Sequence, residues 1–296
     1  MVPSSLGVNI WIVAARPATL AASVAPVLLG CGIAVRDHAA RPLPALGALV
    51  VGLAMQVGVN YANDYSDFRR GADTAERIGP LRAAASGLVP PGRVRTAAIA
   101  AFALAAVAGL ILSLATDPRL IALGVLAVAA GWLYTGGPRP YGYMGLGEVF
   151  VFVFFGLMAT VGTVYVQELR APAAAWIAGV AMGLWAMAIL AMNNLRDVDT
   201  DRAAGKRTLA VRIGRPATRL AIAAMLVGAG VAPVAAAVLH LQPWLVLPAA
   251  VPAGIALARL PGPAVTAGPP LVAALKRIAA LQLVSALLWA LGLLMP

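Results

Sequence analysis

The acidic residues of this chain are scarce, and most of them gather in two short windows. Eleven of the 296 residues are Asp or Glu, and seven of these lie within residues 64–76 and 197–201. Carboxylate oxygens are ligands that Mg²⁺ prefers, and the ion is usually held by a few carboxylates together with substrate phosphates. Neither window contains His or Cys, which disfavours zinc or iron. The windows therefore predict a magnesium-assisted diphosphate site, with a solvated acidic loop as the simpler alternative.

The first window has the spacing of one helical face. Asn60, Asp64 and Asp67 follow an i, i+4, i+7 pattern, so on a helix their side chains point in the same direction. Asp73 lies beyond Gly71, a residue type that commonly ends a helix. We therefore expect three polar side chains to project together from the end of a helix, with a fourth in the loop that follows.

The second window repeats this arrangement. Asn193, Asp197 and Asp201 are spaced i, i+4, i+8 and share a face, whereas Asp199 points the opposite way and is expected at the surface. Arg and Lys residues follow both windows, and such cations neutralise phosphate oxygens through charge-assisted hydrogen bonds. A diphosphate could not lie beside four aspartates unless metal ions separated the like charges.

The composition indicates that these windows are held by membrane helices. Apolar residues make up 61% of the chain and charged residues 11%, whereas soluble domains average about 45–50% apolar. This balance excludes a water-soluble fold and a disordered chain. The single Cys excludes a disulfide framework within one chain. Carboxylates at the ends of membrane helices are costly, so they are candidates for function.

We expect an all-α, polytopic membrane protein in which about nine transmembrane helices surround a central cavity. A helix needs about 20 apolar residues to cross a bilayer. The whole chain, 1–296, is expected to form one domain. The fourth and eighth segments are short, so eight helices are the alternative. The expected segments are 10–35, 43–62, 94–115, 120–135, 146–167, 173–194, 217–240, 244–260 and 276–295.

The basic residues indicate an orientation. On this helix assignment, 17 of the 22 Lys and Arg residues fall in the loops that follow the even-numbered helices. The side richer in basic residues is normally cytoplasmic, which places the N-terminus and both acidic windows in the cytoplasm. The formal net charge of +11 is then mainly a topology signal, and we do not expect nucleic-acid binding.

A diphosphate held at the end of apolar helices implies that the rest of the substrate lies in the membrane, so we expect a prenyl diphosphate. Departure of diphosphate leaves an allylic cation, which requires a dry site lined by aromatic and apolar side chains. The candidate aromatic residues are Tyr61, Tyr65, Trp132, Tyr134, Tyr141 and Tyr143.

The motifs resemble those of a known family. Asn63-Asp64-x-x-Asp67 and Asp197-x-x-x-Asp201 resemble the two Asp-rich motifs of the UbiA superfamily of membrane prenyltransferases. The longer patterns are similar to the menaquinone-pathway branch of that superfamily. They run from Asn63 to Asp73, from Tyr134 to Glu148, and from Asn193 to Leu209.

The resemblance implies a reaction and a subcellular location. The menaquinone-pathway branch transfers a polyprenyl chain from its diphosphate to 1,4-dihydroxy-2-naphthoate, with loss of the acceptor's carboxyl group as CO₂, to give demethylmenaquinone. It therefore implies Mg²⁺ as cofactor, a polyprenyl diphosphate and the naphthoate as substrates, and the lipid bilayer as surroundings. A multi-pass protein of the cell membrane with a cytoplasmic active site is expected.

The resemblance also implies roles for individual residues. Asp64, Asp67, Asp197 and Asp201 would be the catalytic, metal-binding acids, with Asn63, Asn193 and Asp73 as further metal ligands. The expected diphosphate-binding residues are Arg139, Lys206, Arg82 and Tyr134. Arg16 and Asn60 are expected to bind the acceptor.

Two other functions remain open on the sequence. The first is a prenyltransferase for another aromatic acceptor, such as 4-hydroxybenzoate. The second is an ion-coupled secondary transporter, although its acids would be expected near the membrane midplane rather than at one surface. The sequence predicts neither the length of the prenyl chain nor the oligomeric state.

Overall fold

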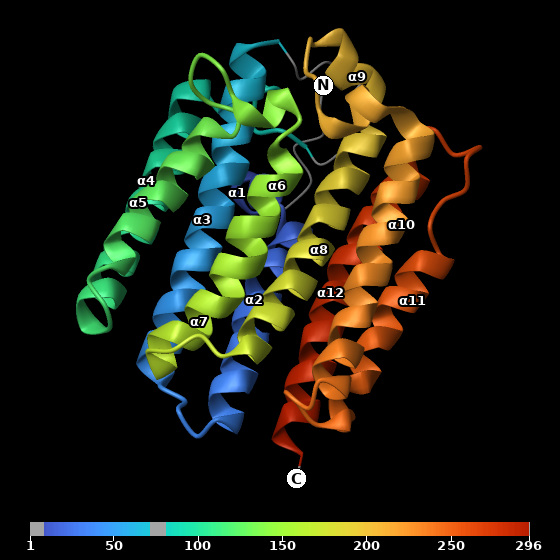
Figure 1. The fold of residues 1–296 in the computed structure, drawn as a ribbon. Coiled ribbons are helices and arrows are strands. Elements are labelled where there is room, and N and C mark those ends of the chain that lie inside the picture. Colours follow the sequence, from blue (N-terminus) through green and yellow to red (C-terminus); the bar gives the residue numbers. More distant parts are fainter. Residues whose placement is uncertain (1–8, 72–80, 296) are drawn as a thin grey trace.

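The computed structural model describes residues 9–71 and 81–295, and this part of the chain consists of helices and loops without a strand (Figure 1). The prediction of an all-α fold is therefore confirmed. The elements are α1 (Ile10–Ala15), α2 (Pro17–Arg36), α3 (Pro42–Arg69), α4 (Pro91–Ala115), α5 (Leu120–Leu133), η1 (Tyr141–Met144), α6 (Gly147–Val151), η2 (Phe152–Met158), α7 (Ala159–Glu168), α8 (Ala173–Arg196), α9 (Val198–Ala203), α10 (Leu209–Val238), η3 (Trp244–Ala250), α11 (Val251–Ala258) and α12 (Pro269–Leu294).

Seven helices in the described ranges are long and apolar enough to cross a membrane, which makes this a multi-pass membrane protein. The fourth and eighth expected segments coincide with shorter apolar helices, Leu120–Leu133 and Trp244–Ala258. The count of nine membrane crossings and the cytoplasmic N-terminus therefore stay predictions. In Figure 1, α4 and α5 form one edge of the bundle, and α10, α11 and α12 form the other.

The first expected helix, 10–35, is wrong as a continuous element, because the chain breaks between α1 and α2. Arg16 has φ 54° and ψ 69°, in the left-handed region. The Pro17 ring disfavours the α conformation for the residue before it, which explains the position of the break. The carbonyl of Ala15 accepts a hydrogen bond from Asn60 Nδ2 (2.8 Å), and that of Arg16 accepts one from Thr19 Oγ1 (2.9 Å). The break is thus held by α3.

Two helices begin earlier than expected. α12 begins at Pro269 rather than at 276, since proline is well suited to the first turn of a helix, where its missing N–H is not needed. α10 begins at Leu209 rather than at 217, but its backbone is non-helical at Gly214 (φ 77°), two residues before Pro216. A short first turn therefore precedes the long membrane helix.

Small residues allow the central helices to pack closely, as expected where lipid removes the hydrophobic drive between helices. η2 is a π-helical turn that lies against α8. A Cβ atom on Gly156 of η2 would lie 2.2 Å from Cα of Gly183, so a side chain does not fit there. Trp185 on α8 and Trp289 on α12 are fully buried in the main apolar core. This packing fixes α8, which carries the second acidic window at its end.

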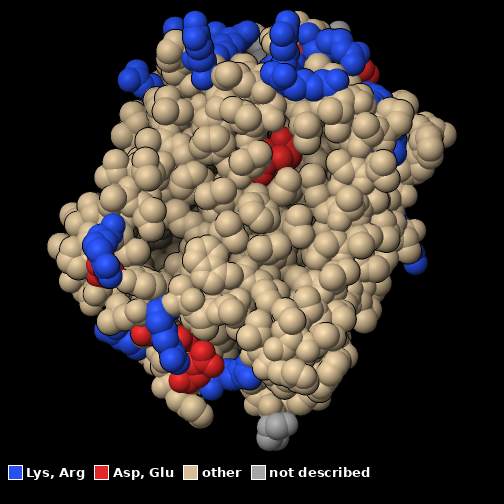
Figure 2. All heavy atoms as spheres, in the orientation of Figure 1, with Lys and Arg blue, Asp and Glu red and all other residues tan. Residues whose placement is uncertain are grey.

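The surface divides into charged ends and an apolar middle. Figure 2 shows Lys and Arg crowded at the end where α9 lies, and a smaller mixed group of acidic and basic residues toward the other end. Large apolar side chains are exposed on α4, α5 and α10, including Leu114, Leu126 and Leu220. Such a surface suits lipid contact.

Candidate active site

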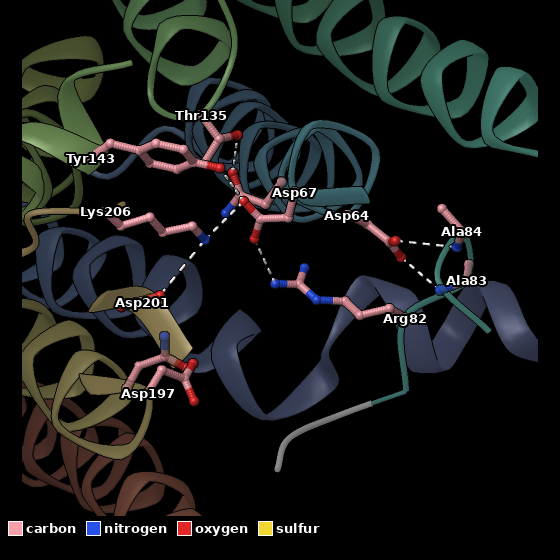
Figure 3. A network of polar contacts seen from close by, with 12 residues as sticks. Asp64, Asp67, Arg82, Ala83, Ala84, Thr135, Tyr143, Asp197, Asp201 and Lys206 are labelled. Atoms are coloured by element: carbon pink, nitrogen blue, oxygen red, sulfur yellow. Dashed lines mark hydrogen bonds and ion pairs between the residues drawn. The ribbon is translucent and has the colours of Figure 1, made fainter. Parts of the chain in front are cut away.

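Asp67 is the centre of a buried polar cluster at the end of α3 (Figure 3). The Tyr143 hydroxyl donates a hydrogen bond to its Oδ1 (2.6 Å), and Lys206 Nζ lies 3.0 Å from the same oxygen. Arg82 donates to Oδ2 at 3.1 Å. The exposed fractions of Asp67, Arg82 and Lys206 are 4%, 8% and 9%. One buried carboxylate thus holds two cations in fixed positions.

Lys206 joins the two acidic windows. Its Nζ lies 3.0 Å from Asp67 Oδ1 and 3.7 Å from Asp201 Oδ1, and it also lies over the Tyr143 ring, 4.7 Å from the centroid. The backbone supports this position, because the Lys206 N–H donates to the Asp201 carbonyl (2.8 Å) and the Arg207 N–H donates to the Tyr143 carbonyl (2.8 Å). The windows therefore meet in space, while their role in metal binding stays a prediction.

The second window keeps its spacing across a helix break. α8 ends at Arg196, Asp197 has φ −96°, and α9 follows. The i, i+4 hydrogen bonds nevertheless continue, from Asp197 N–H to the Asn193 carbonyl (3.2 Å) and from Asp201 N–H to the Asp197 carbonyl (2.8 Å). The Asp199 side chain is 73% exposed and pairs with Arg215, which confirms it as a surface residue.

Arg196 orients the second window and was missed by sequence reasoning. Its Nε and one terminal nitrogen each lie 2.6 Å from an oxygen of Asp197, and that terminal nitrogen also donates to Asn193 Oδ1 (2.9 Å). The Arg196 side chain is buried. Arg196 directly precedes Asp197 in the sequence, but many Arg residues in these loops serve the membrane topology. Nothing in the sequence distinguishes Arg196 from those residues.

Asp64 is turned toward a loop rather than toward Asp67 (Figure 3). Its carboxylate accepts hydrogen bonds from the backbone N–H groups of Ala83 (2.7 Å) and Ala84 (3.2 Å). The neighbouring Arg82 is therefore fixed opposite Asp67. A metal-binding role for Asp64 stays a prediction, and Asp73 lies outside the described residues.

A small polar cavity of about 50 Å³ lies within this cluster. Its walls combine both acidic windows with the cations and with the loop that precedes α6. Sequence reasoning did not select Thr135, whose hydroxyl donates to Asn63 Oδ1 (2.8 Å). The lining residues are Arg16, Asn63, Asp67, Arg82, Tyr134, Thr135, Gly142, Tyr143, Asn193, Asn194, Asp197, Asp201, Lys206 and Thr208.

Three of the expected site residues that the structure describes, Asp64, Arg139 and Asn60, do not line this polar cavity. The side chain of Arg139 is exposed and lies outside the lining, so the structure does not bring it to the cluster. Asn60 lies below the cluster, on the wall of a larger cavity. Tyr143 is at the centre of the cluster, and burial together with the Asp67 carboxylate raises its pKa well above the usual value for tyrosine. Tyr143 is therefore protonated and donates to Asp67.

The polar cavity adjoins a larger, mostly apolar cavity of about 310 Å³. The two share four lining residues, Arg16, Asn63, Tyr134 and Asn193. Side chains from α2, α3, α4, α5, α8 and the segment from α6 to α7 line the larger one, so it runs between the helices. The expected central cavity is thus present beneath the acidic windows.

An aromatic column descends from the polar cavity along this larger one. Tyr134 lies 5.5 Å from Tyr141 between ring centroids, Tyr141 stacks on Phe150 at 3.9 Å, and Phe150 lies 6.2 Å from Phe154. All four line the apolar cavity. Sequence reasoning did not select Phe150 and Phe154: they are four residues apart and so share a helical face, but the surrounding run is apolar on every side, and nothing in it marks which face lines a cavity.

Two of the aromatic candidates serve the protein core instead. The Tyr61 hydroxyl donates to the Trp11 carbonyl (3.0 Å), and its ring packs edge to face against Trp11. Trp132 packs in the same manner against Phe102. Neither lines the apolar cavity, and neither does Tyr65, which packs against the same apolar cluster.

The oxygen donors of the polar cavity suit Mg²⁺ better than a transition metal. Asp67, Asp197 and Asp201 supply carboxylates, and Asn63 and Asn193 supply amide oxygens. Among the residues that the structure describes, no group of three His, Cys, Asp or Glu side chains forms a ready cage. Mg²⁺ does not need one, because substrate phosphates and water normally complete its shell. The donor set fits the ion when a diphosphate is present.

The fold and this site define a class: helical membrane proteins in which an acid-rich polar cavity adjoins an apolar one. The chain belongs to the UbiA prenyltransferase family, whose model matches residues 23–260. The resemblance expected from the motifs is thereby confirmed.

Curated relatives and solved structures extend this assignment. The chain is 50% identical over 75% of its length to the 1,4-dihydroxy-2-naphthoate octaprenyltransferase of Mycobacterium tuberculosis (strain ATCC 25618 / H37Rv), and covers 75% of that protein. It is 38% identical to the protein of the same name in Escherichia coli (strain K12), covering 74% of this chain and 73% of the relative. The fold is similar to that of a UbiA homolog from Archaeoglobus fulgidus bound to DMAPP and Mg²⁺, with a TM-score of 0.70, 14% identity and coverage of 97% of this chain and 100% of that chain.

Proposed function

We propose that this protein is a magnesium-dependent prenyltransferase that moves a polyprenyl chain from its diphosphate to 1,4-dihydroxy-2-naphthoate, releasing CO₂ and giving demethylmenaquinone. The observation that carries the proposal is that the cavity holding the acidic windows and the buried cations adjoins an apolar cavity, with four lining residues in common. The names of the relatives support the naphthoate as acceptor. The active site is proposed to face the cytoplasm of a cell membrane.

The polar cavity would hold the diphosphate head. Lys206 and Arg82 are buried cations that can donate to phosphate oxygens once the substrate competes for them with Asp67. Asp67, Asp197 and Asp201, with Asn63 and Asn193, would hold Mg²⁺. When bound, the ion supplies positive charge that favours departure of diphosphate.

The aromatic column would then face the allylic carbon. Tyr134, Tyr141, Phe150 and Phe154 present π-faces and edges along the cavity, and aromatic faces attract cations. The surrounding apolar lining excludes water, which would otherwise capture the cation. The prenyl tail would extend along the remaining apolar wall.

The proposed reaction needs no dedicated base. The prenyl carbon bonds to the ring carbon that carries the carboxylate, the bond to the carboxylate breaks, and its electron pair restores the aromatic ring. The charges balance, since the negative charge of the acceptor is carried away on diphosphate and CO₂ leaves neutral. Arg16 lines both cavities and is the proposed partner of the acceptor carboxylate.

The test is an acceptor assay with the purified protein in detergent. With Mg²⁺, a polyprenyl diphosphate and 1,4-dihydroxy-2-naphthoate labelled in its carboxyl carbon, we expect a lipid-soluble product and labelled CO₂ in equal amounts. Product from 4-hydroxybenzoate but not from the naphthoate would assign the other acceptor class. No product from either would contradict the proposal.

A further inference from the structure

Four polar side chains form a strip along one wall of the mostly apolar cavity. Thr19 and Ser23 come from α2, one helical turn apart, and Gln56 and Asn60 come from α3, also one turn apart. All four line the cavity, and Arg16 lies at the end of the strip that reaches the polar cavity. Polar groups at this depth are unfavourable unless something binds them.

The upper end of the strip is partly satisfied within the protein. Asn60 Nδ2 donates to the Ala15 carbonyl (2.8 Å) and contacts Thr19 Oγ1 (3.3 Å). Gln56 Nε2 reaches Thr19 Oγ1 and Asn60 Oδ1 only at 3.4 Å each, which is long for a hydrogen bond. These weak contacts leave the strip able to exchange protein partners for a ligand.

The lower end is not satisfied. Ser23 is 2% exposed, and within the described parts of the chain its hydroxyl has no hydrogen-bond partner. A serine in a helix can donate to the carbonyl four residues earlier, but this hydroxyl does not do so. Ser23 belongs to the cavity wall although its hydroxyl is itself buried, so a ligand group would reach this hydroxyl by rotation of the side chain about the Cα–Cβ bond and would supply the missing hydrogen bond.

We propose that this strip is the subsite for the ring hydroxyls of a hydroxylated aromatic carboxylate. The inference rests on the proposed function. With the acceptor carboxylate on Arg16, the adjacent hydroxyl meets Thr19 and Asn60, and the hydroxyl across the ring meets Ser23 and Gln56. The two levels are four residues apart on each helix, a rise of about 6 Å, which is close to the separation of two hydroxyls on opposite sides of one ring.

The strip also places the acceptor opposite the aromatic column. The strip belongs to α2 and α3, whereas Tyr141, Phe150 and Phe154 come from η1, α6 and η2 on another wall. A ring bound to the strip is thereby presented across the cavity to the allylic carbon. An acceptor with a single hydroxyl would satisfy only one level.

The experiment compares Ser23→Ala with a matched variant, Thr160→Val. Thr160 is also fully buried without a partner for its hydroxyl among the described residues, but it does not line the cavity. For each protein we would measure KM for 1,4-dihydroxy-2-naphthoate and the inhibition constant of 1-hydroxy-2-naphthoate, which lacks the distal hydroxyl. KM for the polyprenyl diphosphate is measured in parallel.

Ser23→Ala is expected to raise KM for the dihydroxy acceptor about tenfold, while the inhibition constant of the monohydroxy analogue, KM for the diphosphate and kcat stay within twofold. Thr160→Val should change none of these. An equal loss for both aromatic ligands, no loss for either, or the same loss in Thr160→Val would overturn the subsite. A wild-type protein that prenylates no aromatic acceptor would instead overturn the proposed function.

Discussion

At the scale of single residues, Asp67 holds the polar cluster together. It accepts from Tyr143, Arg82 and Lys206 and lies 96% buried, so its negative charge determines where both cations stand. Removing one partner of a buried charged group leaves the others uncompensated. A change of charge at this position therefore affects the whole polar cavity.

Asp67→Asn should lower kcat/KM for the polyprenyl diphosphate by roughly 10²–10³, a size typical of losing a group that stabilises developing charge. The volume is unchanged, so the protein should remain extractable and monodisperse. Asp199→Asn is the matched control, because the Asp199 side chain is 73% exposed. Asp199→Asn should keep kcat/KM within twofold of the wild type. Equal losses of kcat/KM in the two variants would show that Asp67 has no specific role in the site.

At the end of the molecule away from the acidic windows, Asp117 gives a prediction about how thermal stability depends on pH. Hydrogen bonds from the Arg119 side chain and from the Tyr165 hydroxyl (2.6 Å) lower the pKa of the Asp117 carboxyl below its ordinary value. A carboxyl whose pKa is lower in the folded state stabilises the fold above its unfolded pKa, about 3.9, and this stabilisation is lost as the pH falls toward the folded value. Asp117→Asn should therefore unfold at a lower temperature than the wild type at pH 7, and the gap should narrow below about pH 4.

Thermal unfolding of both proteins in detergent at pH 7, 5 and 3 measures this gap. A difference in Tm that is the same at all three values would show that the Asp117 charge does not act on stability. Tyr165 belongs to α7, so the result also reports on the link between that helix and the loop before α5.

At the scale of elements, the walls of the apolar cavity determine which tails fit. A cavity of about 150 Å³ holds one benzene ring, so about 310 Å³ cannot enclose an acceptor and a long polyprenyl chain together. Part of the tail must therefore lie outside the cavity, and we expect it to leave past α5 and α7. Gly124 on α5 and Gly162 on α7 line the cavity, and a Cβ atom on either would have no described atom within 4 Å.

Gly124→Leu should fill tail space without disturbing the backbone. We expect kcat/KM for a long polyprenyl diphosphate to fall about tenfold, or about 1.4 kcal/mol, while geranyl diphosphate is used within twofold of the wild type. Gly254→Leu on α11 is the control, because that position is equally open but lies outside the cavity lining. Equal effects on the short and long substrates would show that the tail does not pass Gly124.

Features set by local helix geometry could be predicted from the sequence, whereas features set by the docking of loops could not. The spacing of Asn60, Asp64 and Asp67 depends only on local helix geometry, and all three lie buried on α3. The turning of Asp64 toward the 83–84 backbone and the exposure of Arg139 depend on how loops dock, which no local pattern encodes. Pro17 indicates a possible break at Arg16, but the apolar run on both sides favoured one continuous helix over 10–35.

At the scale of the whole molecule, the charge distribution predicts an orientation that labelling can test. In a Cys31→Ala background, Arg70→Cys and Ala203→Cys should react with a membrane-impermeant reagent from the same side. Both positions are exposed near the acidic windows. His38→Cys and His240→Cys lie in exposed turns after α2 and α10 and should react from the opposite side. Labelling of positions 70 and 203 from different sides would contradict the topology.

Both acidic windows are proposed to serve one metal-bound diphosphate, and a binding measurement tests this directly. A non-reactive thio-analogue of a polyprenyl diphosphate should bind the wild type at least tenfold more tightly with Mg²⁺ than with EDTA. Asp67→Asn and Asp197→Asn should each abolish that difference, and the double variant should bind no worse than either, because residues of one shared site are not additive. Equal affinity with Mg²⁺ and with EDTA, or additive losses in the double variant, would contradict this proposal.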